Sequence, residues 1–134
     1  MDWTRFALAV LIAGIVVSFS DWLFMGVLYH DRYNDNPEIW RKPHGGHETG
    51  GVILSTVLAF VTCAVFAVLC GWLHLHTYLA TLGLALALWL VGPLPLISTN
   101  AVFIKLYPGV SISHATGWLA RLCLIAVTMT IVLK

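Results

Sequence analysis

The chain has 134 residues, a formal net charge of +1, three cysteines and six histidines. Hydrophobic residues make up 60% of it and charged residues only 10%, and its mean hydropathy is +0.90. These values exclude a water-soluble globular domain, because polar side chains are too few to cover its surface. Nucleic acid is excluded as a partner, because no segment carries the basic stripe or patch that binds phosphates.

Four apolar stretches follow one another along the chain, each long enough for a helix of about 20 residues to cross a bilayer. They cover about residues 6–29, 52–73, 78–106 and 111–133, joined by one polar loop at 30–51 and by short turns. We therefore expect an all-α integral membrane protein, a four-transmembrane-helix bundle in the lipid bilayer. Residues 1–134 should form a single transmembrane domain.

The first predicted span places one acidic residue on a face of small and apolar ones. At helical spacing, Gly14, Ser18, Asp21, Met25 and Leu28 share one side of the helix. An aspartate is costly in contact with lipid. We therefore expect this side to face the other helices.

The polar loop at 30–51 holds two weak candidates for a metal site, His44 and His47. They are separated by two glycines, and no CxxC or HExxH spacing supports them, so a solvated loop without metal is the expected alternative. A haem would need two histidines facing each other at membrane depth, whereas every histidine lies at a span end or in a loop. We expect no cofactor.

Two features shape the second half of the chain. The join at 74–77 is so short that the third span should return antiparallel beside the second, as a helical hairpin. Within the third span, Gly92, Pro93 and Pro95 interrupt the apolar run, and a proline ring removes backbone hydrogen bonds. The expected result is a kink near the middle of the third span.

Two ionisable residues lie well inside the spans, Asp21 in the first and Arg121 in the fourth. Asp21 lies about 12 Å of helix from Tyr29, and Arg121 about 15 Å from Ser111, measured from the same membrane face. This matching depth predicts that the two side chains pair. Asn100 in the third span enters from the same face, so we place it with them.

The fourth span adds His114, which shares one helical face with Gly117, Trp118 and Arg121. This face can line a narrow, water-accessible pocket that leads from the end of the span to Arg121. Trp118 lies within one turn of Arg121, where its indole can stack on the guanidinium. Ordinary packing or lipid contact is the alternative for this tryptophan.

These residues support two interpretations. In the first, Asp21, Asn100, Arg121 and His114 bind a small polar or anionic ligand or relay a proton, a role typical of ionisable groups inside membranes. In the second, Asp21 and Arg121 form a structural ion pair, satisfied by Asn100, that orients the helices and binds nothing. Both interpretations require the pairing.

Two blocks of sequence carry a family resemblance: SDWLFMGVLYHDRY at 20–33 and ISTNAVFIKLYPGVSISHATGWLA at 97–120. They resemble the small four-span bacterial membrane proteins catalogued as domain of unknown function 1761. The resemblance implies a four-span fold and a location in the bacterial inner (plasma) membrane. That family has no assigned activity, so the resemblance implies no catalytic residue.

Three functions are open at this point. In the first, the buried site binds or transports a small polar ligand or a proton, and the chain forms a homo-oligomer because four spans enclose little volume. In the second, the chain is an accessory or structural subunit whose faces contact partner helices of a larger membrane complex. The third, a membrane enzyme with a metal at the loop histidines, has no supporting catalytic motif. An internal cavity that reaches Arg121 would favour the first function over the second.

Overall fold

A computed structural model of the chain describes residues 2–31, 49–104 and 106–133. Every regular element in these ranges is helical, which confirms the all-helical class. The elements are α1 (Trp3–Leu23), the π-helix η1 (Phe24–Leu28), α3 (Thr49–Trp72), α4 (Tyr78–Val91), α5 (Pro93–Phe103) and α6 (Pro108–Val132). His44 and His47 lie outside the described residues, so the weak metal site stays a prediction.

Four helical units among the described residues are long and apolar enough to cross a membrane. Because α1 runs on into η1 and α4 into α5, the units are Trp3–Leu28, Thr49–Trp72, Tyr78–Phe103 and Pro108–Val132. The four expected long apolar helices are therefore confirmed. The first begins earlier than expected because Asp2 caps it, accepting a hydrogen bond of 2.9 Å from the backbone N–H of Thr4.

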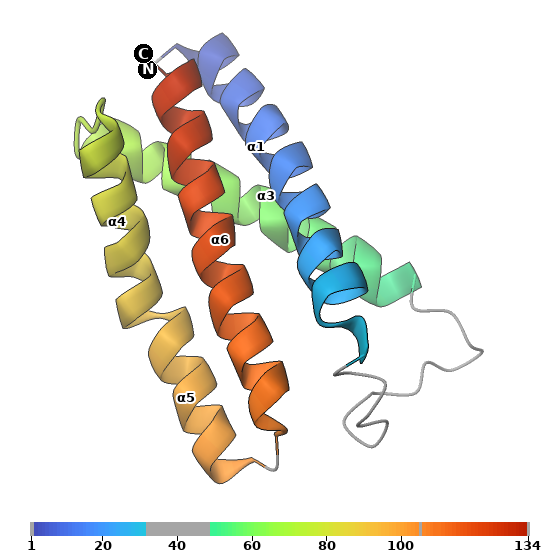
Figure 1. Cartoon of the computed structure of the whole chain (residues 1–134). Helices are drawn as coiled ribbons and strands as arrows, with labels where there is room; N and C mark the ends of the chain where they lie inside the picture. The colour runs from blue at the N-terminus through green and yellow to red at the C-terminus, as the bar shows by residue number, and fades with distance from the viewer. Residues whose placement is uncertain (1, 32–48, 105, 134) are drawn as a thin grey trace.

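The central helix is α6, which has α1 on one side and α4 and α5 on the other (Figure 1). Two hydrogen bonds fasten α4 to α6. The hydroxyl oxygens of Thr81 and Thr130 lie 2.7 Å apart in the core, and the indole N–H of Trp89 donates to the carbonyl oxygen of Ala115 at 2.9 Å. Both bonds satisfy polar groups that would be costly to bury unpaired.

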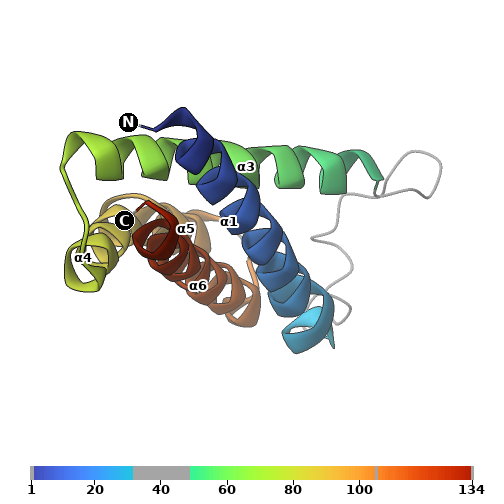
Figure 2. The ribbon, with the colours of Figure 1, turned by 90° about the horizontal axis from the view of Figure 1, so that it is seen from above.

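Helix α3 crosses α1 at a steep angle instead of lying alongside α4 (Figures 1 and 2). The expected hairpin of the second and third spans is therefore wrong. At the join, His74 has a positive φ of 53°, and the N–H of Leu75 donates to the carbonyl oxygen of Cys70 at 2.9 Å. This left-handed cap ends α3 sharply, and α4 then packs on α6.

The crossing of α1 and α3 is close because small residues meet there. Ala13 of α1 and Ala59 and Cys63 of α3 are fully buried. Gly14 lies against the ring of Phe60, so that a Cβ atom on Gly14 would clash with the ring. Small residues permit this approach, and two steeply crossed helices touch over a short length and diverge beyond it.

The third unit bends between α4 and α5, at Gly92 and Pro93. The bend is mild, 24°. Backbone hydrogen bonds continue on both sides of it, since the N–H of Gly92 donates to Leu88 at 3.0 Å and the N–H of Leu96 donates to Gly92 at 3.2 Å. The expected kink is therefore present but small, because the prolines remove few of the helix's hydrogen bonds.

The predicted inward face of the first span holds only for its earlier part. Gly14 is buried and Asp21 is partly buried, but Met25 is 39% exposed and Leu28 is 59% exposed. The last two belong to η1, whose π-helical turn contains more residues than an α-helical turn. This turn rotates the later side chains about the axis. The expectation is wrong for Leu28, whereas Met25 still faces the other helices, because it lines one cavity together with Ser18 and Asp21.

The close contact at Gly14 predicts a position-specific effect of a single methyl group. We expect Gly14→Ala to lower the free energy of unfolding by about 1–2 kcal/mol, because overpacking outweighs the helix propensity that alanine adds. Gly83→Ala is the matched control, since nothing lies within 4 Å of a Cβ atom there. Thermal unfolding in detergent measures both variants. Equal stability of the two would contradict the close crossing.

Candidate functional site

The structure brings Asp21 and Arg121 together across the interface of α1 and α6. The Nε–H of Arg121 donates to Oδ1 of Asp21 at 3.1 Å, and its Nη2 group donates to Oδ2 of the same carboxylate. The two parallel hydrogen bonds make a bidentate, charge-assisted pair, the strongest common form of this interaction. We call it the Asp21–Arg121 pair.

Trp118 holds the arginine from its other side. The guanidinium carbon of Arg121 lies 4.4 Å from the centre of the Trp118 ring, within the range of a cation–π interaction. The exposed fraction of the side chain is 13% for Arg121 and 28% for Asp21. The pair is thus partly buried, and its two charges cancel. No described residue accepts a hydrogen bond from the Nη1 group of Arg121, which keeps donors for a further partner.

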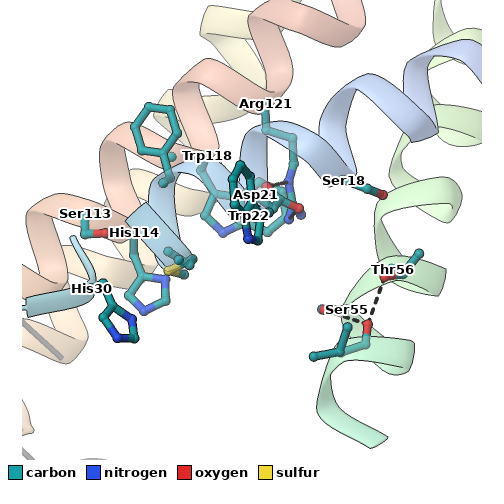
Figure 3. Close-up of a pocket in the computed structure, with 15 residues that line it drawn as sticks. Ser18, Asp21, Trp22, His30, Ser55, Thr56, Ser113, His114, Trp118 and Arg121 are labelled. Atoms are coloured by element: carbon teal, nitrogen blue, oxygen red, sulfur yellow. Dashed lines mark hydrogen bonds and ion pairs between the residues drawn. The ribbon is translucent and has the colours of Figure 1, made fainter. Parts of the chain in front are cut away.

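A cavity of about 640 Å³ lies beside the Asp21–Arg121 pair, within the size range of small-molecule sites (Figure 3). Its walls come from α1 and η1, from the first two turns of α3, and from α6. We call it the α1–α3 cavity. The lining residues are Ser18, Asp21, Trp22, Phe24, Met25, Gly26, His30, Val52, Ser55, Thr56, Ser113, His114, Gly117, Trp118 and Arg121.

The hydroxyl groups of the cavity wall already donate to the backbone. Ser55 and Thr56 each donate to the carbonyl oxygen of Val52 at 2.9 Å, and Ser18 donates to Gly14 at 2.8 Å. Their oxygen atoms can still accept hydrogen bonds. The cavity therefore offers hydroxyl acceptors on the α3 wall, opposite the arginine donors on the α6 wall.

His114 lines the same cavity as Arg121, as its place on the helix predicts. It lies seven positions earlier on α6, about 10 Å along the helix axis. His30, which follows η1, lies on the same side of the cavity as His114 and Ser113 (Figure 3). The polar lining therefore extends from these histidines to the Asp21–Arg121 pair.

Asn100 does not line the α1–α3 cavity, although sequence reasoning placed it there. It belongs to α5, which packs on α6 on the flank opposite α1 (Figure 1). Depth along a helix was the only basis for the prediction, and depth does not fix the direction round the bundle. Sequence reasoning also missed Ser55 and Thr56, whose signal is two adjacent hydroxyl residues near the start of a strongly apolar span.

The described part of the chain contains no cluster of side chains that could bind a metal ion. No group of three or more histidine, cysteine, aspartate or glutamate side chains in residues 2–31, 49–104 and 106–133 lies close enough to hold an ion. His30, His114 and Asp21 all line the cavity, but they do not lie close enough to one another to hold an ion. Its chemistry is that of hydrogen bonding beside a neutral ion pair.

Comparison with known proteins adds no assignment. No protein-family model, no curated protein and no solved structure matches this chain. The resemblance to the family of domain of unknown function 1761 therefore stays a prediction. The site is interpreted from its own geometry.

The Asp21–Arg121 pair predicts strong coupling between its two members. We expect Asp21→Asn or Arg121→Gln to lower the free energy of unfolding by about 3 kcal/mol, because each leaves one partly buried charge unpaired. The double variant Asp21→Asn/Arg121→Gln should lose less than either single variant, since it leaves no charge. Arg5→Gln is the control, because the Asp2 and Arg5 side chains are both 57% exposed. Denaturant unfolding in detergent measures the coupling, and additive losses would contradict it.

Proposed function

We propose that the protein spans a membrane with four helices and binds a small polar ligand in the α1–α3 cavity, beside the Asp21–Arg121 pair. The observation that carries this proposal is the cavity itself. It reaches both charged residues and adds hydroxyl, imidazole and indole groups from three helical units.

A membrane environment explains the outer surface of the described helices. Large apolar side chains project from it along every unit, among them Leu79 (87% exposed), Val91 (77%) and Phe103 (83%). In water, such a surface would drive aggregation, whereas lipid tails solvate it. The four long apolar helices fit the same environment. The inner membrane of a bacterium is the proposed location, on the basis of the resemblance of residues 20–33 and 97–120.

The cavity favours ligand binding over a purely structural role for the ion pair. A pair that only orients helices is best enclosed by packing, because its attraction is strongest where water is excluded. Here an open space of about 640 Å³ borders both residues. The pair is also neutral, so the cavity itself holds no unpaired charge inside the membrane.

An accessory subunit of a larger complex is the second candidate, and one observation favours it. No residue of α5 is buried, so this helix presents its sides to the surroundings. Partner helices, a second copy of the chain or lipid can cover it. The experiment below separates this candidate from the first.

Filling the cavity tests the proposed binding. Gly117 lines the cavity, and a Cβ atom there would meet the Phe24 ring only at 3.7 Å, so Gly117→Leu fits the fold while occupying ligand space. We expect native mass spectrometry of the gently extracted wild type to show one small molecule bound per chain. Gly117→Leu should lose that molecule.

The matched control makes the same change where no cavity exists. Gly83→Leu projects into open space on α4 and should keep the bound molecule. Wild-type protein that carries no small molecule but co-purifies with a stoichiometric partner polypeptide would overturn ligand binding in favour of the accessory subunit.

A further inference from the structure

We propose that the ligand of the α1–α3 cavity is an acidic membrane lipid, whose anionic headgroup enters sideways between α1 and α3 and binds at Arg121. This inference rests on the proposed function and names the class of ligand. It follows from three features of the cavity: the direction of its opening, its unused hydrogen-bond donors and the order of its polar residues.

The cavity opens toward the side of the bundle. Away from their crossing, α1 and α3 diverge toward the η1 end of the molecule (Figure 2). Helices α4 and α5 pack on the other flank of α6, so neither covers the gap. At its edges lie Trp22 of α1 and Val52 of α3, which are 57% and 58% exposed. Among the described residues, therefore, this side is open to lipid in a bilayer.

Unused hydrogen-bond donors lie near the ion pair. The Nη1 group of Arg121 and the indole N–H groups of Trp22 and Trp118 have no acceptor among the described residues. Asp21 is already engaged by the arginine through both of its oxygens. A ligand group rich in acceptors satisfies these donors, and an anionic phosphate or carboxylate does so with charge-assisted bonds.

The polar residues of the cavity lie along the way from the end of α6 to Arg121, where the headgroup would bind. His114 lies six positions from the start of α6 at Pro108, about 9 Å along the axis, and Arg121 lies about 20 Å along it. The distance to Arg121 places it deep within a hydrocarbon core about 30 Å thick. Gly117 and Trp118 line the cavity between these two residues, and the hydroxyl groups of Ser55 and Thr56 line its α3 wall. A lipid can hold its headgroup on this path while its acyl chains stay in the bilayer, against the apolar edges of the opening.

A free anion fits the same donors but not the same opening. Phosphate or a soluble phosphate ester would gain nothing from a cavity that faces lipid along its apolar edges. A lipid fits both the donors and the opening, because its chains remain solvated by the bilayer while its headgroup is bound. The geometry therefore favours the lipid as the source of the anionic group.

Titration of the delipidated protein in detergent tests this inference by native mass spectrometry. The probes are dioleoyl phosphatidylglycerol, which is acidic, and dioleoyl phosphatidylcholine, which is zwitterionic. Glycerol 3-phosphate supplies the soluble headgroup without chains. We expect the wild type to bind one phosphatidylglycerol about 10-fold or more tightly than phosphatidylcholine, because the quaternary ammonium of phosphatidylcholine brings a second positive charge beside Arg121. An excess of glycerol 3-phosphate should not displace the lipid.

Variants locate the binding. Asp21→Asn/Arg121→Gln removes the arginine without leaving a charge, and Gly117→Leu fills the cavity, so both should lose the preference for phosphatidylglycerol. Gly83→Leu should keep it. Equal binding of the two lipids, or an unchanged preference in the double variant, would overturn the proposal that the ligand is an acidic lipid.

The soluble probe separates failure of the lipid from failure of the cavity. Displacement by glycerol 3-phosphate, with loss of both probes in Gly117→Leu, would replace the lipid by a soluble anion and leave the proposed cavity function standing. If Gly117→Leu bound every probe as the wild type does, both proposals would be overturned.

Discussion

The steep crossing of α3 over α1 determines where this small fold has open space between its helices. Gly14 and the neighbouring small residues let the two helices touch at one short contact, and beyond it the helices separate. The α1–α3 cavity opens on the η1 side of that contact. On the side of the chain ends, a second cavity of about 530 Å³ opens against the last turns of α3, near Cys70, Gly71 and Leu133. Open space on both sides of the contact is what a crossed pair of straight helices produces.

The Asp21–Arg121 pair converts the larger space into a polar site. Removing two charges from water is costly, and a bidentate geometry with an indole ring against the guanidinium offsets part of that cost. Two apolar residues would hold α1 and α6 together at lower cost in lipid. The cavity beside the pair gives the remaining donors of Arg121 access to a partner, which packing of α1 against α6 alone does not require.

The sequence predicts well what depends on position along a helix. Hydropathy alone identifies the four long helices, and counting residues from the span ends places Asp21 and Arg121 at matching depth. His114 follows from the helical repeat of α6, because it shares the face that carries Arg121. These inferences use only the rise and the repeat of a regular helix, which are the same in every protein.

What depends on direction round the bundle could not be predicted. Asn100 has the depth of the ion pair but approaches α6 from the opposite flank, and Ser55 and Thr56 reach the cavity only because α3 is tilted. The π-helical turn rotates Leu28 outward, although the spacing of an α-helix places it inward. The short join at 74–77 indicates an antiparallel hairpin of α3 and α4, yet α3 packs on α1 instead, through small residues on both helices. Packing between helices determines each of these features, and the hydropathy of a sequence contains no information about that packing.

The central claim is that a polar, accessible cavity lies within a membrane-spanning bundle, and cysteine accessibility tests it most directly. In a chain with Cys63, Cys70 and Cys123 replaced by alanine, Thr56→Cys places a thiol in the cavity. Val65→Cys is the control, because Thr56 and Val65 each lie about 10 Å from an end of α3 (Thr49–Trp72) and Val65 does not line the cavity. A charged methanethiosulfonate reagent, applied to membranes, should label Thr56→Cys and leave Val65→Cys unlabelled. Labelling of neither thiol would contradict an accessible cavity, and equal labelling of both would contradict a membrane-spanning α3.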